Sequence, residues 1–356
     1  MRTVLHQLAL LFLLLIVSLT GLAQKPEAFV IDTITGQPGE KTSGFLEVPK
    51  GIDEGTSIPI TIVHGVRPGP VLTLIAGVHG AEYAPIIALQ RIRTTLRPRD
   101  LSGTVILVQV ANLPSFLKRT IYYGPTDGKN LNRVFPGKAD GTLSERIAYT
   151  LVEKIFKRTD YLIDIHCGDS NEALIPYVAY YTEHSDPAVV EKSRSMALAF
   201  GIEYVKAISG RSKDFGTAVY STNASFLLGK PTMAVESGEL GRTDEESVSR
   251  IEKGVVNVLI HLQMVPGILA KPPQHVFVIR DETIRATDTG IFYPLVTRGS
   301  NVKKGTPVGY LTDFFGNRLT ESRAPFDGVI LYILGTPPVS AGEPLFSLGQ
   351  LATKPL

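Results

Sequence analysis

The chain has 356 residues, 44% of them hydrophobic and 20% charged, so it is long enough for one large core and a smaller second one. Lysine plus arginine (36) nearly balances aspartate plus glutamate (34), and the net charge of +2 excludes a basic surface for nucleic acid and an acidic tail. The single cysteine excludes an internal disulfide.

Residues 1–23 are typical of a secretory signal peptide. Arg2 gives a charged start, about a dozen apolar residues follow, and Gly21-Leu22-Ala23 forms a small-x-small cleavage site. A membrane anchor normally needs ~20 apolar residues. We therefore expect an exported protein, periplasmic or secreted, that begins near Gln24 and keeps no stable membrane anchor.

Residues 58–76 hold two strand-like stretches on either side of the turn-forming run Arg67-Pro68-Gly69-Pro70. We expect a hairpin here that leads into the next motif. His64 lies in the first stretch without a partner at ligand spacing, and it is expected to be structural.

The second stretch runs into a glycine-flanked turn that carries His79 and Glu82. An imidazole and a carboxylate three residues apart, where a strand ends and a helix begins, can converge on one Zn²⁺ and leave room for a third ligand and water. The H-x-x-E pattern alone is weak, because many surface helices carry such a pair.

Helical and strand patterns alternate after this turn, which predicts an α/β domain over residues 24–266. The expected elements are a helix over 82–97, a strand over 104–110, a helix near 143–157, a strand over 161–166, a helix near 188–201, a strand over 232–237 and a helix near 245–264.

A loop of about thirty residues, 112–142, interrupts this alternation, and loops of that length inside a compact domain are usually functional. It contains Arg119 and the polar run that includes Asn132 and Arg133. Arginine in such a loop suits an anionic substrate.

Two later strands end in polar groups. The first ends at His166, which offers a third metal ligand, and the second ends at Glu236. In open α/β sheets, sites form outside the carboxyl ends of strands. Cys167, next to His166, is either a thiol beside the metal or a buried residue, as free cysteines usually are.

Residues 273–350 follow a Pro/Gly-rich boundary and are rich in strand patterns. Val302–Leu311 and Val339–Leu348 repeat the pattern V-x-x-G-x-P-[VL]-x-x-L, which suggests a small quasi-symmetric sandwich resembling lipoyl-type domains. A carrier role needs a lysine on the exposed hairpin, and residues 324–328 have none. We expect this domain to form a wall over the active site; the alternative is a module that only stabilises the main domain.

Four motifs in this order, G-x-H-G-x-E, L-N-R-x-F-P-G, D-x-H-x-G and V-E-x-G, resemble the succinylglutamate desuccinylase/aspartoacylase family of the zinc carboxypeptidase superfamily. The resemblance covers roughly residues 45–350. It implies a zinc-carboxypeptidase-like mixed sheet flanked by helices and one zinc per chain, held by His79, Glu82 and His166.

The resemblance also implies roles for four other residues. Glu236 would be the general base, Asn132 and Arg133 would hold a substrate carboxylate, and Arg119 would polarise the scissile carbonyl. Cys167 departs from the small hydroxyl residue expected after the ligand histidine.

The function that follows is a zinc-dependent amidohydrolase that cleaves an amide, or an ester, of a small carboxylate-bearing substrate such as an N-acyl amino acid. Two alternatives stay open. One is a periplasmic metallocarboxypeptidase acting on short or cell-wall peptides, and the other is an inactive zinc-containing binding protein.

Overall fold

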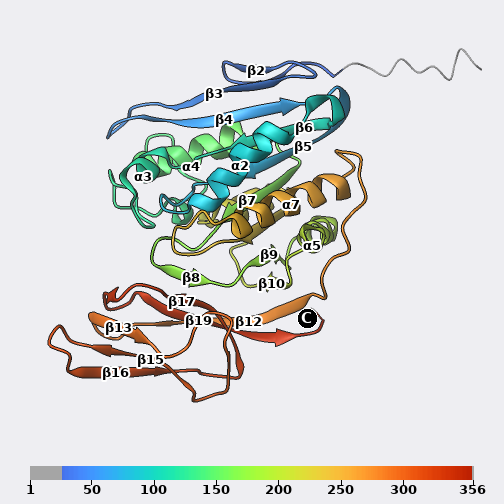
Figure 1. Cartoon of the computed structure of the whole chain (residues 1–356). Helices are drawn as coiled ribbons and strands as arrows, with labels where there is room; N and C mark the ends of the chain where they lie inside the picture. The colour runs from blue at the N-terminus through green and yellow to red at the C-terminus, as the bar shows by residue number, and fades with distance from the viewer. Residues whose placement is uncertain (1–25, 355–356) are drawn as a thin grey trace, which may run out of the picture.

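The computed structural model describes residues 26–354, which form an α/β body with an all-β region at one end (Figure 1). The expected signal peptide, residues 1–23, lies outside the described residues. Within 26–354, no helix is long and apolar enough to cross a membrane.

A mixed sheet of 13 strands runs through the centre of the molecule. From one edge to the other its strands are β14 (Asn301–Val302), β17 (Gly328–Leu334), β19 (Pro344–Ala352), β12 (Val276–Arg285), β10 (Tyr204–Ile208), β9 (Tyr177–Tyr181), β11 (Thr232–Glu236), β7 (Tyr161–His166), β5 (Arg67–Ile75), β6 (Ser102–Val108), β4 (Thr56–His64) and β3 (Lys41–Val48), and β8 (Glu172–Leu174) also pairs with β17.

Helices cover both faces of this sheet (Figure 1). Side chains alternate along a strand, so Leu72 and Leu74 of β5 pack on one face and Ile75 on the other. The first face is covered by α2 (Tyr83–Thr95), α5 (Pro187–Phe200) and α7 (Glu245–His261), and the second by α4 (Leu143–Lys154), α6 (Ser221–Leu227) and the small hairpin of β1 (Phe29–Ile31) and β2 (Ile34–Gly36). The mixed sheet flanked by helices confirms the predicted fold class.

The hairpin expected around residues 67–70 is wrong. Strand β4 pairs with β3 and β6, and β5 pairs with β6 and β7, so β6 separates the two strands. Gly103 in β6 allows the start of β5 to lie this close to β6, because a Cβ at residue 103 would lie 2.1 Å from the carbonyl oxygen of Pro70. His64 is structural, as expected: its ring nitrogens lie 2.8 Å from Thr104 Oγ1 and from the carbonyl oxygen of Glu27.

Three neighbouring strands place the predicted polar groups at one edge. Strand β7 is parallel to both β5 and β11, so their carboxyl ends meet. In the β7–β11 register, His166 is directly opposite Glu236.

The C-terminal region is a sandwich. A second sheet, β16 (Arg318–Arg323), β15 (Pro307–Thr312), β13 (Gly290–Pro294) and β18 (Pro338–Val339), shares an apolar core with β14, β17 and β19. Each copy of the sequence repeat is a short strand in one sheet, a glycine turn and a longer strand in the other sheet. Gly305 and Gly342 adopt φ of +84° and +87° in the two turns.

The sandwich is continuous with the α/β body. Strand β12 pairs in parallel with β10 at its start and antiparallel with β19 along most of its length. Strand β8, which follows the loop after His166, pairs with β17. Arg298 forms an ion pair with Glu239 in the loop after Glu236. The C-terminal region is therefore attached to the loops that surround the strand ends.

Candidate metal centre

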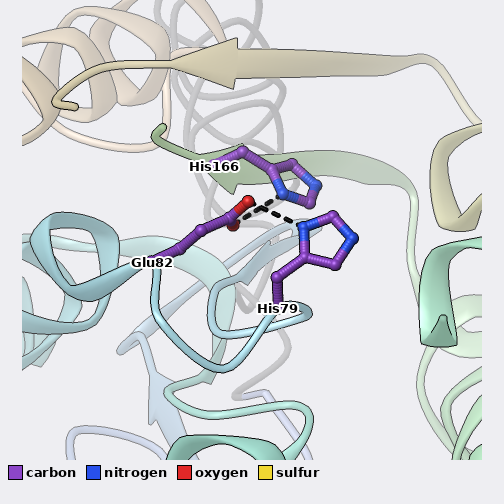
Figure 2. A group of neighbouring side chains, drawn as sticks. All are labelled: His79, Glu82 and His166. Carbon is purple, nitrogen blue, oxygen red and sulfur yellow. Dashed lines mark hydrogen bonds and ion pairs between the residues drawn. The ribbon is translucent and has the colours of Figure 1, made fainter. Parts of the chain in front are cut away.

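His79, Glu82 and His166 converge at the carboxyl edge of the sheet (Figure 2). His79 lies in the turn after β5, Glu82 immediately precedes α2 and His166 ends β7. Nδ1 of His79 lies 2.7 Å from one Glu82 oxygen, and Nδ1 of His166 lies 2.8 Å from the other. Burial alone would raise the pKa of Glu82, but the two histidines hold it at about 2. Two imidazole nitrogens and an ionised carboxylate within 4.8 Å of one another fit a zinc ion.

The outer nitrogens of both histidines are held by polar side chains. Nε2 of His166 lies 3.1 Å from Asp164 Oδ2, and Nε2 of His79 lies 3.2 Å from Asn130 Oδ1. Asp164 also accepts a hydrogen bond from the Ser221 hydroxyl. Partners on the far ring nitrogen fix the orientation of a metal-binding histidine, so both Nδ1 atoms are the ones presented to a metal.

Gly80 fixes the position of the His79 turn. A Cβ at this residue would lie 2.4 Å from the backbone carbonyl of Ser115 in α3 (Leu113–Lys118). We expect Gly80→Ala to displace His79 and to weaken zinc binding by about 10–100-fold, the usual effect of disturbing the support of a metal-binding histidine. Titration of the purified protein with zinc measures this. Gly216→Ala is the control, because a Cβ there meets nothing closer than 3.6 Å; unchanged zinc affinity in Gly80→Ala would contradict the prediction.

Glu236 lies beside this group and is not one of its three members. Burial raises the pKa of its carboxyl well above the ordinary value, although nearby His166 acts in the opposite direction. Its Oε2 is buried and has no hydrogen-bond partner among the described residues. A buried oxygen of this kind normally has a partner, often water or a ligand.

Asn132 and Arg133 lie in a short 3₁₀ turn that follows Asn130, the residue in contact with His79. The Oδ1 atom of Asn132 accepts a hydrogen bond of 2.9 Å from the backbone N–H of Ser221. The guanidinium of Arg133 donates to the carbonyl oxygen of Asn132 and stacks 4.7 Å from the centre of the Tyr220 ring. Among residues 26–354 no carboxylate pairs with Arg133, so it is available to an anion.

Arg119 is not joined to these groups, whereas Cys167 is buried close to Glu82 and Glu236. Arg119 ends α3 in a left-handed conformation with φ of 55°, and its side chain is exposed. No hydrogen bond or ion pair of its side chain joins it to the other predicted residues within the described chain. The Cys167 side chain is buried in the core beneath α2, and burial raises the pKa of its thiol well above the ordinary value.

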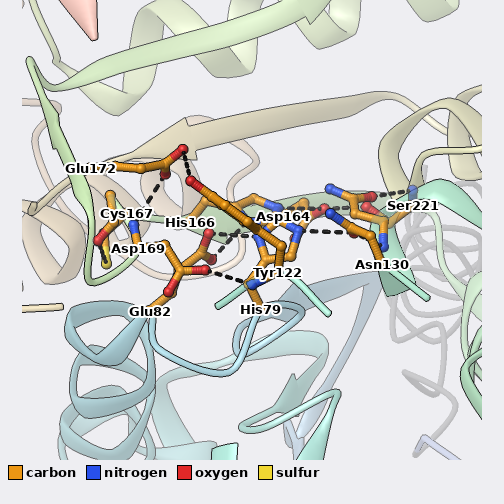
Figure 3. A network of polar contacts seen from close by, with 12 residues as sticks. His79, Glu82, Tyr122, Asn130, Asp164, His166, Cys167, Asp169, Glu172 and Ser221 are labelled. Atoms are coloured by element: carbon orange, nitrogen blue, oxygen red, sulfur yellow. Dashed lines mark hydrogen bonds and ion pairs between the residues drawn. The ribbon is translucent and has the colours of Figure 1, made fainter. Parts of the chain in front are cut away.

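Tyr122 and Glu172 are functional candidates that the sequence patterns did not indicate (Figure 3). The Tyr122 ring meets the His79 ring edge-on, with 6.1 Å between centroids, and its hydroxyl donates to Glu172 at 2.8 Å. Tyr122 has φ of 59°, and Asp169 accepts a hydrogen bond from its backbone N–H. Such a conformation is rare for a bulky residue and is concentrated at functional sites.

A cavity of about 260 Å³ lies beside Asn130, whose Oδ1 contacts His79. Tyr122, Asn130, Arg133 and Glu172 line one side, and Arg285, Tyr332 and Glu343 of the C-terminal sandwich line the other. The sandwich therefore contributes a wall to this cavity, as expected. Its volume is slightly below the ~300–1,000 Å³ typical of ligand pockets, so it suits a small ligand.

Comparisons with known proteins identify relatives over most of the chain. The family model described as "Succinylglutamate desuccinylase/Aspartoacylase catalytic domain" matches residues 68–262. The N-alpha-acetyl-L-2,4-diaminobutyric acid deacetylase of Halomonas elongata is 34% identical over 299 residues, which cover 81% of this chain and 85% of the relative.

Solved structures resemble the chain over most of its length. A succinylglutamate desuccinylase from a Silicibacter species gives a TM-score of 0.80 at 25% identity, covering 92% of this chain and 99% of the other. The product-bound ectoine utilization protein EutE (DoeB) of Ruegeria pomeroyi gives 0.79 at 25% identity with the same coverage.

Proposed function

Because this chain belongs to the succinylglutamate desuccinylase/aspartoacylase family, whose members include amide-bond deacylases, we propose that it is a zinc-dependent deacylase of small N-acyl amino acids. The convergence of His79, Glu82 and His166 in one buried group is the observation that carries the proposal. A zinc ion bound there would act as a Lewis acid and make water nucleophilic at neutral pH.

Glu236 is the residue that moves the proton in this proposal. Its free Oε2 lies in a buried carboxylate opposite His166, where it can accept a proton from the attacking water and return it to the leaving amine. Burial raises the pKa of Glu236, which makes its carboxylate a stronger base than that of an ordinary glutamate.

Arg133 binds the α-carboxylate of the substrate and Asn132 fixes the turn that presents it. The guanidinium is held by Tyr220 and by the chain itself, so little side-chain freedom is lost on binding. The wall formed by the C-terminal sandwich limits the cavity, which favours a small acylated amino acid over a peptide chain.

The test is a comparison of kcat/KM for N-acetyl amino acids and their carboxamides with the zinc-loaded protein. The acids should be cleaved faster, by roughly 10-fold or more, because the guanidinium binds a charged carboxylate more strongly than a neutral carboxamide. Arg133→Lys should remove most of this preference and keep the zinc, since lysine lacks the planar fork. Equal rates for acid and amide in the wild type would contradict the carboxylate-binding role.

We also propose that the protein is exported. The reason is the predicted signal segment alone, and the expected result is a mature protein that begins near Gln24. N-terminal sequencing of the protein purified from its native host measures this. A chain that still begins at Met1 would contradict cleavage.

A further inference from the structure

Glu172 is a carboxylate in the cavity wall that the proposed reaction does not use. It lies in β8, after the loop that follows His166, and its side chain is half-buried. One oxygen accepts the Tyr122 hydroxyl at 2.8 Å, and the other accepts the backbone N–H of Asp169 at 3.1 Å. Both donors are neutral.

Within residues 26–354, no lysine, arginine or histidine forms an ion pair with Glu172. Burial raises the pKa of this carboxyl, as expected where no cation compensates its charge. Arg285 lines the same cavity, but it is exposed and donates to the carbonyl oxygen of Gly342. Glu343, also on the wall, is exposed and solvated, and accepts a hydrogen bond from Ser340.

The surroundings of Glu172 are rich in carboxyl groups. Glu82, Asp164, Asp169 and Glu236 are clustered around the two histidines. A carboxylate in such surroundings is normally paired with a cation, and Glu172 has only neutral donors, so a cationic group is expected from the substrate.

The cavity thus presents Arg133 and Glu172, which do not pair with each other. We propose that Glu172 is a specificity-determining residue: it binds a protonated amine on the substrate side chain while Arg133 binds the carboxylate. This inference rests on the proposed deacylase function, and it narrows the substrates to N-acyl amino acids with a short, positively charged side chain.

Three N-acetyl amino acids of nearly equal size test the inference. Nα-acetyl-2,4-diaminobutyrate, N-acetylhomoserine and N-acetylnorvaline end in an ammonium, a hydroxyl and a methyl group. The wild type should prefer the ammonium to the hydroxyl compound by about 10–100-fold in kcat/KM, the usual effect of a hydrogen bond to a charged group. Glu172→Gln should reduce this ratio to about threefold or less, because the amide keeps the shape and loses the charge.

Glu203→Gln is the matched control, because Glu203 is exposed outside the cavity and should keep the wild-type ratio. Zinc content and thermal unfolding show whether Glu172→Gln is folded; if it is not, Glu172→Asp replaces it, and the ratio is expected to fall there too. Equal rates for the ammonium and hydroxyl compounds in the wild type, or a preference that survives both substitutions, would overturn the role of Glu172 and leave the deacylase function intact. Failure to cleave any of the three would overturn the deacylase function and this inference with it.

Discussion

Replacing His166 by alanine is expected to reduce bound zinc from about one ion per chain to nearly none, and hydrolysis should fall with it. The substitution removes one of three converging groups and leaves Asp164, which is completely buried, without its imidazole partner. His79→Ala should have the same effect, because it removes the other Nδ1 that faces Glu82. Elemental analysis of purified protein and a hydrolysis assay measure both effects.

The control is His261→Ala. His261 is half-buried on α7, where it contacts Ser195 and takes no part in the converging group. This variant should keep its zinc and its activity. Full zinc occupancy in either ligand variant would show that the metal is held elsewhere.

Replacing Glu236 by glutamine is expected to lower kcat by about 10²–10⁴-fold, the usual contribution of a general base, while zinc stays bound. Glutamine keeps the size of the side chain but cannot accept a proton. In the wild type, activity should rise with pH as Glu236 loses its proton, because only the ionised form accepts one from water. Burial moves the pKa of Glu236 upward, so this rise should occur above the pH range of an ordinary glutamate.

Steady-state kinetics over a range of pH, combined with zinc analysis, measures these effects. The matched control is Glu252→Gln on α7, where the side chain pairs with Arg91. Loss of zinc from Glu236→Gln would make Glu236 a ligand instead of a base. Turnover close to that of the wild type would remove it from the mechanism.

The strands that carry the site could be predicted because each is a short apolar run that stops at a polar residue. Strand β7 has the bounds expected from the sequence, and β11 ends within one residue of them. The residue that holds the His166 ring could also have been inferred. Asp164 lies two residues before His166, and alternate residues in a strand share a face.

Other features could not be read from local patterns. The turn residues at 67–70 mark a change of chain direction, but they do not say which strands become neighbours, and β6 lies between the two. Tyr122 and Glu172 are fifty residues apart in sequence. They meet because β8 is fixed by β17 of the C-terminal sandwich, which is a contact between distant parts of the chain.

The pairing of β8 with β17 also determines when the pocket can exist. Tyr332 and Glu343, on one side of the cavity, lie near the end of the chain. The residues on the other side all come earlier in the sequence, the last of them being Glu172. Synthesis proceeds from the N-terminus, so the converging histidines are made long before the surface that encloses a substrate. Pairing across such a separation is slow, because loop-closure entropy is lost before the contacts form. A chain still emerging from the ribosome can therefore hold the metal ligands without a closed pocket, and substrate selection begins only when the last strands have joined the sheet.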